Sequence, residues 1–141
     1  MAVAPMRLID SLSHAAAALV EALDADACAI SRVLGDVLLL VTEHTLPGTT
    51  LLVGQGYLVS EYPETQQVLA TGRPRTVCVA DAEVDPAEDR VLRDLGFASM
   101  LMLPLELAGE RWGLVEVYRA APKPFGPAEM RAASVVLAEL G

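Results

Sequence analysis

Apolar residues recur at helical spacing near both ends of the chain. Between Met6 and Leu23 they form one broad stripe: Leu8, Ile9, Leu12, Ala15, Ala16, Leu19, Val20 and Leu23. Steps of three and four residues place side chains on one helix face, so the pattern predicts a helix over 6–23 that covers a core. A second helix is predicted from Pro127, a suitable first helical residue. Its stripe consists of Met130, Ala133, Leu137 and Leu140.

Apolar runs of strand length lie between these helices and are separated by turn signals. Ala27–Leu34 and Asp36–His44 flank Gly35, which can take the positive φ of a tight hairpin turn. A third run, Thr49–Val59, begins as a strand and is interrupted by two glycines. The later predicted strands are Arg75–Asp81, Ser99–Leu107 and a strand that ends at Tyr118 after an Ala108-Gly109-Glu110 turn.

Two shorter helices are predicted in the middle of the chain. One begins near Pro63 and ends at Gly72. The other has Asp85 as its N-cap, with Glu88 reaching back as in a capping box, and ends at Gly96. The acidic residues around this second helix start are interpreted as serving capping and solubility.

The resulting order is helix, two or three strands, helix, strand, helix, two strands, helix. Strands joined by tight turns pair antiparallel. The strand Ser99–Leu107 is apolar on both faces, as a sheet covered on both sides requires. We therefore expect one α+β domain over 1–141. It contains an antiparallel sheet of five or six strands, with the terminal helices on one face and the middle helices on the other.

Composition and charge exclude several functions. The formal net charge of −9 disfavours nucleic acid and anionic membranes as partners. Apolar runs stay well short of the ~20 residues of a membrane span. The two cysteines, Cys28 and Cys78, lie inside apolar runs without the spacing of a disulfide framework or a zinc site, which favours free thiols in a cytoplasmic protein. Motifs for hydrolases, phosphate binding and metal binding are absent, so no catalysis, metal or cofactor is expected.

A series of short motifs between Thr71 and Ala138 occurs in a characteristic order. They are Thr71-Gly72, Leu95-Gly96-Phe97 with Ser99, Pro104-Leu105, Gly109, Trp112-Gly113-Leu114 and Phe125 followed by Glu129. Together they resemble the GAF domain family, over nearly the whole chain. The resemblance implies a PAS-related fold with a small-molecule pocket under the middle helices. It also implies a regulatory role, as in sensor kinases, cyclic-nucleotide phosphodiesterases, diguanylate cyclases and transcription factors.

The resemblance also indicates pocket residues. The stretch RWGLVEVY resembles the phytochrome GAF strand that lines the chromophore cavity, which places Glu116 and Tyr118 in the pocket. Met100 and Met102 of the paired strand would join them, although a bulge could turn Ser99, Leu101 and Leu103 inward instead. The complete expected ligand-binding set is Tyr118, Glu116, Met100, Met102, Ser99, Tyr57 and Val79.

Glu116 needs a partner if it is buried, because an unpaired buried carboxylate is costly. The candidates are Tyr118, a backbone N–H, Arg93 or a ligand cation. The alternative is that Glu116 is a satisfied core residue or lies at a solvated sheet edge.

The ligands known for the family fit this sequence poorly. Neither cysteine has the sequence context for bilin attachment or the reactive set of a methionine sulfoxide reductase. The cyclic-nucleotide signature is broken at Arg119-Ala120 and Glu129-Met130, and the candidate haem ligand is His44. We therefore expect a sensory or regulatory module for an unidentified small molecule. The alternatives are a ligand-free dimerisation scaffold and a small reductase that uses Cys28 or Cys78.

The terminal helices suggest a homodimer. The Ala15–Ala18 run would let a second helix approach closely, so two helices from each subunit could form a four-helix bundle. By resemblance, such helices connect a GAF domain to an output domain. The output domain would be part of the same larger signalling protein or of a protein on which this domain acts.

Overall fold

The computed structural model describes residues 7–45, 51, 54–81 and 83–140. The elements follow the predicted order, with one added 3₁₀ turn, η1. They are α1 (Leu8–Ala22), β1 (Ala27–Leu34), β2 (Val37–Thr45), β3 (Gly56–Leu58), η1 (Val59–Glu61), α2 (Pro63–Thr71), β4 (Arg75–Cys78), α3 (Pro86–Leu95), β5 (Ser99–Leu107), β6 (Glu110–Arg119) and α4 (Pro127–Ala138).

One six-stranded sheet, in the order β3-β2-β1-β6-β5-β4, forms the centre of the fold. Every neighbouring pair is antiparallel, as predicted. Two tight hairpins set the registers of β1 with β2 and of β5 with β6. In the second hairpin, Ala108 and Gly109 both take positive φ, of 52° and 80°. This is the conformation of the turn type that matches strand twist.

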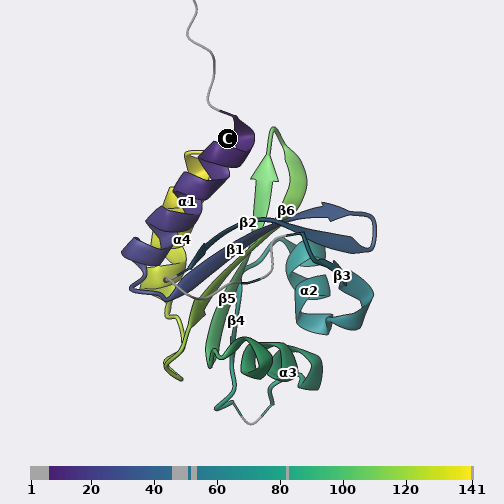
Figure 1. Ribbon diagram of the computed structural model, residues 1–141, viewed down its shortest axis with the longest axis vertical. Helices are drawn as coiled ribbons and strands as arrows, with labels where there is room; N and C mark the ends of the chain where they lie inside the picture. The colour runs from purple at the N-terminus through teal and green to yellow at the C-terminus, as the bar shows by residue number, and fades with distance from the viewer. Residues whose placement is uncertain (1–6, 46–50, 52–53, 82, 141) are drawn as a thin grey trace, which may run out of the picture.

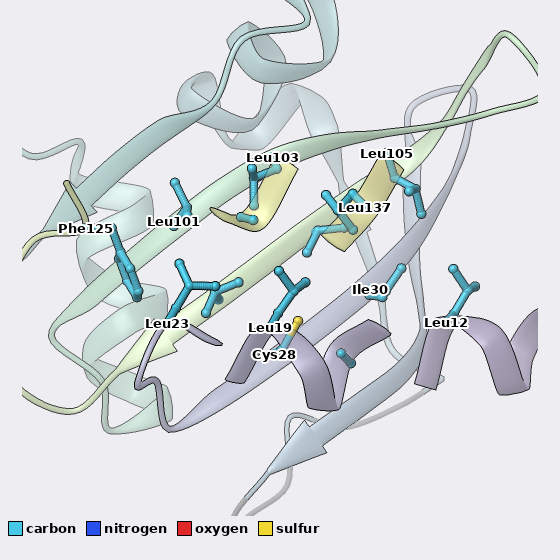
Figure 2. Close-up of a cluster of buried hydrophobic side chains, with 14 residues drawn as sticks. Leu12, Leu19, Leu23, Cys28, Ile30, Leu101, Leu103, Leu105, Phe125 and Leu137 are labelled. Atoms are coloured by element: carbon cyan, nitrogen blue, oxygen red, sulfur yellow. The ribbon is translucent and has the colours of Figure 1, made fainter. Parts of the chain in front are cut away.

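The helices divide between the two faces of the sheet, as predicted. Figure 1 shows α1 and α4 against each other on one side and α2 and α3 on the other. Figure 2 shows the core under the terminal helices, to which α1 contributes Leu12 and Leu19 and β5 contributes Leu101 and Leu103. A second core lies under α2 and α3. The domain therefore has two apolar layers separated by one sheet.

Two predicted strands are shorter in the structure. The third strand is limited to Gly56–Leu58, because Gly54 turns the chain at a φ of 96° just before it. Leu51 lies outside regular structure, and the rest of this predicted strand before Gly54 falls outside the described residues. The strand predicted over Arg75–Asp81 ends at Cys78. There the Asp81 carboxylate accepts a hydrogen bond from the Cys78 N–H at 3.2 Å, which closes a turn.

Gly113 allows β6 to approach β1 closely. A Cβ atom at this position would lie 1.9 Å from the Ser31 carbonyl oxygen, far inside van der Waals contact. The glycine of the Trp-Gly-Leu motif therefore has a packing role in the sheet.

A buried arginine joins β6 to both terminal helices. The Arg119 guanidinium donates hydrogen bonds to the carbonyl oxygen of Leu23, just after α1, and to the Glu129 carboxylate in the first turn of α4. It also lies over the Phe125 ring, 4.0 Å from the centroid. Among the described helices, none has the length and apolar character needed to span a membrane.

Candidate functional site

A small cavity lies between the sheet and the middle helices, on the face opposite α1 and α4. Its volume is about 40 Å³. The lining side chains come from both sides of this layer: Ala29, Ser31, Leu38, Leu40, Leu51, Tyr57, Tyr62, Thr65, Glu88, Val91, Leu95, Glu116 and Tyr118. The wall is mostly apolar, with a few polar groups that converge on one space, as is typical of small-molecule sites.

Glu116 and Tyr118 are supplied by β6. They are two residues apart and so lie on the same face of the strand. The Tyr118 hydroxyl donates a hydrogen bond to the Glu116 carboxylate. The Tyr118 ring stacks on Phe97, with centroids 5.0 Å apart and planes at 24°, which fixes the position of the hydroxyl. The structure thus identifies Tyr118 as the protein partner of Glu116. Arg93 is instead paired with Asp89, at 3.0 Å.

The pKa of Glu116 is raised to about 8, mainly by burial and also by the negative charge of Glu88. The Tyr118 hydrogen bond acts in the opposite direction and offsets only part of this rise. Glu116 retains some accessible surface, which faces the cavity that it lines. Desolvation of the carboxyl group is nevertheless the largest cause of its raised pKa.

Glu88 reaches the cavity from the first turn of α3 and is only 2 % exposed. Its Oε1 accepts a hydrogen bond from the Thr65 hydroxyl of α2 at 3.1 Å. Burial raises the pKa of Glu88 to about 7, against the lowering effect of the Thr65 hydrogen bond. The predicted capping box is thus only half formed. Asp85 caps the helix by accepting from two backbone N–H groups, while Glu88 turns inward.

Two tyrosines complete the wall from the segment around β3 and η1. The Tyr57 and Tyr62 rings meet edge to face, with centroids 6.2 Å apart. Burial raises the pKa of both phenols, so they remain neutral. Tyr57 was expected in the pocket, whereas Tyr62, Thr65 and Glu88 were missed. The signal for Glu88 was available, because it continues the stripe of Val91, Leu92 and Leu95 at helical spacing.

The structure brings together only part of the expected ligand-binding set. Glu116, Tyr118 and Tyr57 line the cavity. Met100 and Met102 belong to the core beneath it, and the Met102 sulfur lies 3.7 Å from the Thr65 hydroxyl oxygen.

Ser99 and Val79 do not reach the cavity wall. The Ser99 hydroxyl donates to the Ala121 carbonyl oxygen at 3.1 Å and contacts the Cys78 sulfur, while Val79 packs at the edge of the core beneath the cavity. The register explains the difference. Met100 pairs with Tyr118 and Met102 with Glu116, so Ser99, Leu101 and Leu103 fall on the opposite face.

Comparison with known proteins identifies the family. The family model described as GAF domain matches residues 7–141, so the chain belongs to the GAF domain family. None of the curated proteins matches the sequence.

Solved structures share this fold at low sequence identity. The phycocyanobilin-bound GAF domain from a cyanobacterial phytochrome has a TM-score of 0.81 at 19 % identity, over 96 % of this chain and 82 % of that one. The GAF domain of a two-component sensor histidine kinase from Bacillus halodurans has a TM-score of 0.76 at 15 % identity, over 94 % and 90 % of the chains. The chromophore-binding domain of a bacteriophytochrome from R. palustris has a TM-score of 0.79 at 12 % identity, over 94 % of this chain and 54 % of that one.

Proposed function

We propose that this GAF domain is a non-catalytic sensory or regulatory module. It binds a small molecule in the cavity on the α2–α3 face of the sheet. Ligand occupancy is passed through the sheet to α1 and α4, and from there to an output domain in the same or another protein. The similar structures include a sensor kinase domain and chromophore-bound domains, which supports this class of function.

The alternation of side chains along β6 carries this proposal. Glu116 and Tyr118 face the cavity, while Val115 and Val117, on the same strand, pack in the core under the terminal helices. Arg119, the next residue, binds the end of α1 and the start of α4. A ligand that shifts β6 therefore acts directly on both helices. In a close-packed domain such a shift requires the core to rearrange.

Other ligand and activity classes have less support. A tetrapyrrole needs a pocket of several hundred Å³, roughly 300–1,000 Å³ for typical ligand sites, against about 40 Å³ here. No cysteine is among the described residues that line this cavity. Cys28 lies in the core under the terminal helices, and burial raises its pKa far above the usual value, which opposes thiolate chemistry.

A second candidate function is a ligand-free dimerisation scaffold. The small volume of the cavity favours it, because the site is nearly filled by its own side chains. Apolar side chains also remain exposed on the terminal helices, notably Leu8, Ile9 and Val135. A cytoplasmic homodimer fits both candidate functions.

Native mass spectrometry of freshly purified protein, combined with Tyr118→Ala, tests the proposal. A sensor is expected to carry or capture a small molecule, and Tyr118→Ala is expected to reduce its retention. Leu103→Ala is a suitable control, because it opens a similar void in the core under the terminal helices without touching the cavity. The sensor proposal fails if the protein retains no ligand under any condition, or if both variants lose ligand and stability equally.

A further inference from the structure

We infer that the ligand of this cavity is a small protonated amine, held between Glu88 and Glu116 with its alkyl part against the apolar wall. The inference rests on the proposed function and adds the chemical class of the ligand.

The acidic groups around the cavity favour either bound protons or a positively charged partner. Two carboxyl groups, from Glu88 and Glu116, face one small space, and no lysine, arginine or histidine is among the described residues that line it. Asp85 and Glu64 add further negative potential at Glu88. Buried carboxylates without a counter-charge are costly. An ammonium group would remove this cost without any change in the protein.

Glu116 has unused hydrogen-bonding capacity. An ionised carboxylate accepts about four hydrogen bonds. Within the described residues, Tyr118 is the one donor to Glu116. Glu88, by contrast, is held by Thr65 of α2. A primary ammonium has three N–H donors. It could therefore donate to Glu116, which has free acceptor positions, while Glu88 is held in place by Thr65.

The remaining walls suit an aliphatic cation rather than an inorganic ion. Leu38, Leu40 and Leu51 provide apolar contacts for a short alkyl chain, and Tyr57 and Tyr62 add aromatic surface that attracts cations. A water-sized position occupies ~10–15 Å³, so about 40 Å³ admits only about three or four non-hydrogen atoms. Tetrapyrroles and nucleotides are far larger than this.

A hollow on the surface indicates the route into the cavity. Tyr57, Tyr62, Val91 and Leu95 line both the cavity and an outer hollow of about 480 Å³, so they form the wall between the two. The hollow also contains Glu61, Asp94 and Arg90, which gives it an excess of negative charge. Rotation of a tyrosine would join the two spaces, and the negative rim would favour approach of a cation.

Titration followed by NMR of backbone amides, with n-propylammonium as the probe, tests the inference. Neutral 1-propanol and anionic propionate are matched in size but lack the positive charge. Ligands of this size bind weakly, so a method that detects millimolar affinity is needed. We expect n-propylammonium at pH 9 to shift the amides of Thr65 and Tyr118, with an affinity at least tenfold above that of the other two compounds.

Charge-neutral variants and pH provide the controls. Glu116→Gln and Glu88→Gln should each weaken n-propylammonium binding at least tenfold, while Glu110→Gln, an exposed change on the same strand, should have no effect. The affinity should fall at least tenfold between pH 9 and pH 6, because both carboxyl groups take up protons there. The probe keeps its charge in this range, since alkylamines titrate near pH ~10.4. The phenols of Tyr57, Tyr62 and Tyr118 stay neutral at these pH values.

The outcomes separate the inference from the proposed function. Equal binding of 1-propanol, or unchanged binding in Glu116→Gln, overturns the amine assignment. If neutral or anionic compounds shift the cavity amides and n-propylammonium does not, the assignment fails and the sensory function stands. If no compound of any charge in a mixed library shifts them, the site does not bind ligands, and both proposals fail in favour of the scaffold.

Discussion

Glu88 and Glu116 lie on opposite walls of one cavity, the first on α3 and the second on β6. Burial is the main cause of the raised pKa of both carboxyl groups, and the negative charge of Glu88 also raises the pKa of Glu116. Glu116 has a pKa of about 8 and Glu88 of about 7. At neutral pH the pair therefore holds about one proton, unless a cation replaces it.

The first prediction concerns stability and pH. A carboxyl group with a raised pKa in the folded state stabilises the fold at low pH, and this contribution is lost as the pH rises from about 4.5 to about 8. Each pKa unit corresponds to about 1.4 kcal/mol, so the free energy of unfolding should fall by a few kcal/mol over this range. Urea denaturation of the ligand-free protein at several pH values measures it.

Glu116→Gln should flatten this profile and equal or exceed the stability of the wild type at pH 8.5. Glu110→Gln, at an exposed site, should leave the dependence of the free energy of unfolding on pH as it is in the wild type. A profile that is unchanged by Glu116→Gln would show that this carboxyl group is already ionised at neutral pH.

The second prediction concerns Gly113. Its replacement by Ala would place a Cβ atom 1.9 Å from the Ser31 carbonyl oxygen, so β1 and β6 would have to separate. We expect a loss of about 3 kcal/mol or more in the free energy of unfolding. Gly56→Ala is the matched control, because its Cβ would meet Val37 at an ordinary 3.7 Å. Equal effects of the two substitutions would contradict a steric role for Gly113.

The third prediction concerns Arg119. Its planar guanidinium binds several acceptors at once, including the Leu23 carbonyl oxygen and the Glu129 carboxylate, and stacks on Phe125. A lysine ammonium cannot reproduce this arrangement. We expect Arg119→Lys to lower the free energy of unfolding by about 2–3 kcal/mol, since buried acceptors lose their donors. Amide exchange should also accelerate at the start of α4.

Arg93→Lys is the comparison for this substitution. Arg93 is exposed, and within the described part of the chain its ion pair is with Asp89 of the same helix, so the substitution should change the free energy of unfolding by less than about 0.5 kcal/mol. If Arg119→Lys were equally mild, Arg119 would not be the connection between β6 and the terminal helices.

The fourth prediction concerns dimerisation. Leu12 and Leu19 are fully buried against the sheet, so they are not available to a partner helix. Leu8 and Val135 are 45 % and 65 % exposed, and a hollow between α1 and α4 is lined by Leu8, Ala15 and Ala18 with Val136 and Leu140. We expect a dimer in sedimentation equilibrium that is weakened by Leu8→Glu with Val135→Glu. Val37→Glu, at an exposed site on the β1–β2 hairpin, should leave it intact.

A wild type that stays monomeric at high micromolar concentration would exclude the dimer. A dimer that persists in the double variant would place its interface away from the terminal helices.

Local sequence signals predicted most of the fold. The strands Ala27–Leu34 and Ser99–Leu107 match the structure at both ends, because turn residues follow each of them directly. Gly72 and Gly96 end their helices in the left-handed conformation that glycine favours. Among the described residues the third strand is shorter than predicted, because its apolar composition continues on both sides of the turn at Gly54.

The sequence by itself determined the order of the elements, and that Glu116 shares one strand face with Tyr118 and Met100 shares one with Met102. These depend on periods of two and about 3.6 residues, which are local properties of the chain. The helical spacing of Glu88 and Leu92 indicates that Glu88 lies on the apolar face of α3, but only the tertiary structure decided that it meets Thr65 at the cavity. The tertiary structure also decided that Ser99 lies on the sheet face opposite the cavity, and that Leu12 and Leu19 are buried in the core between α1 and the sheet. Each of these depends on which elements pack against each other. The residues adjacent to a side chain in the sequence do not specify its contacts with other elements.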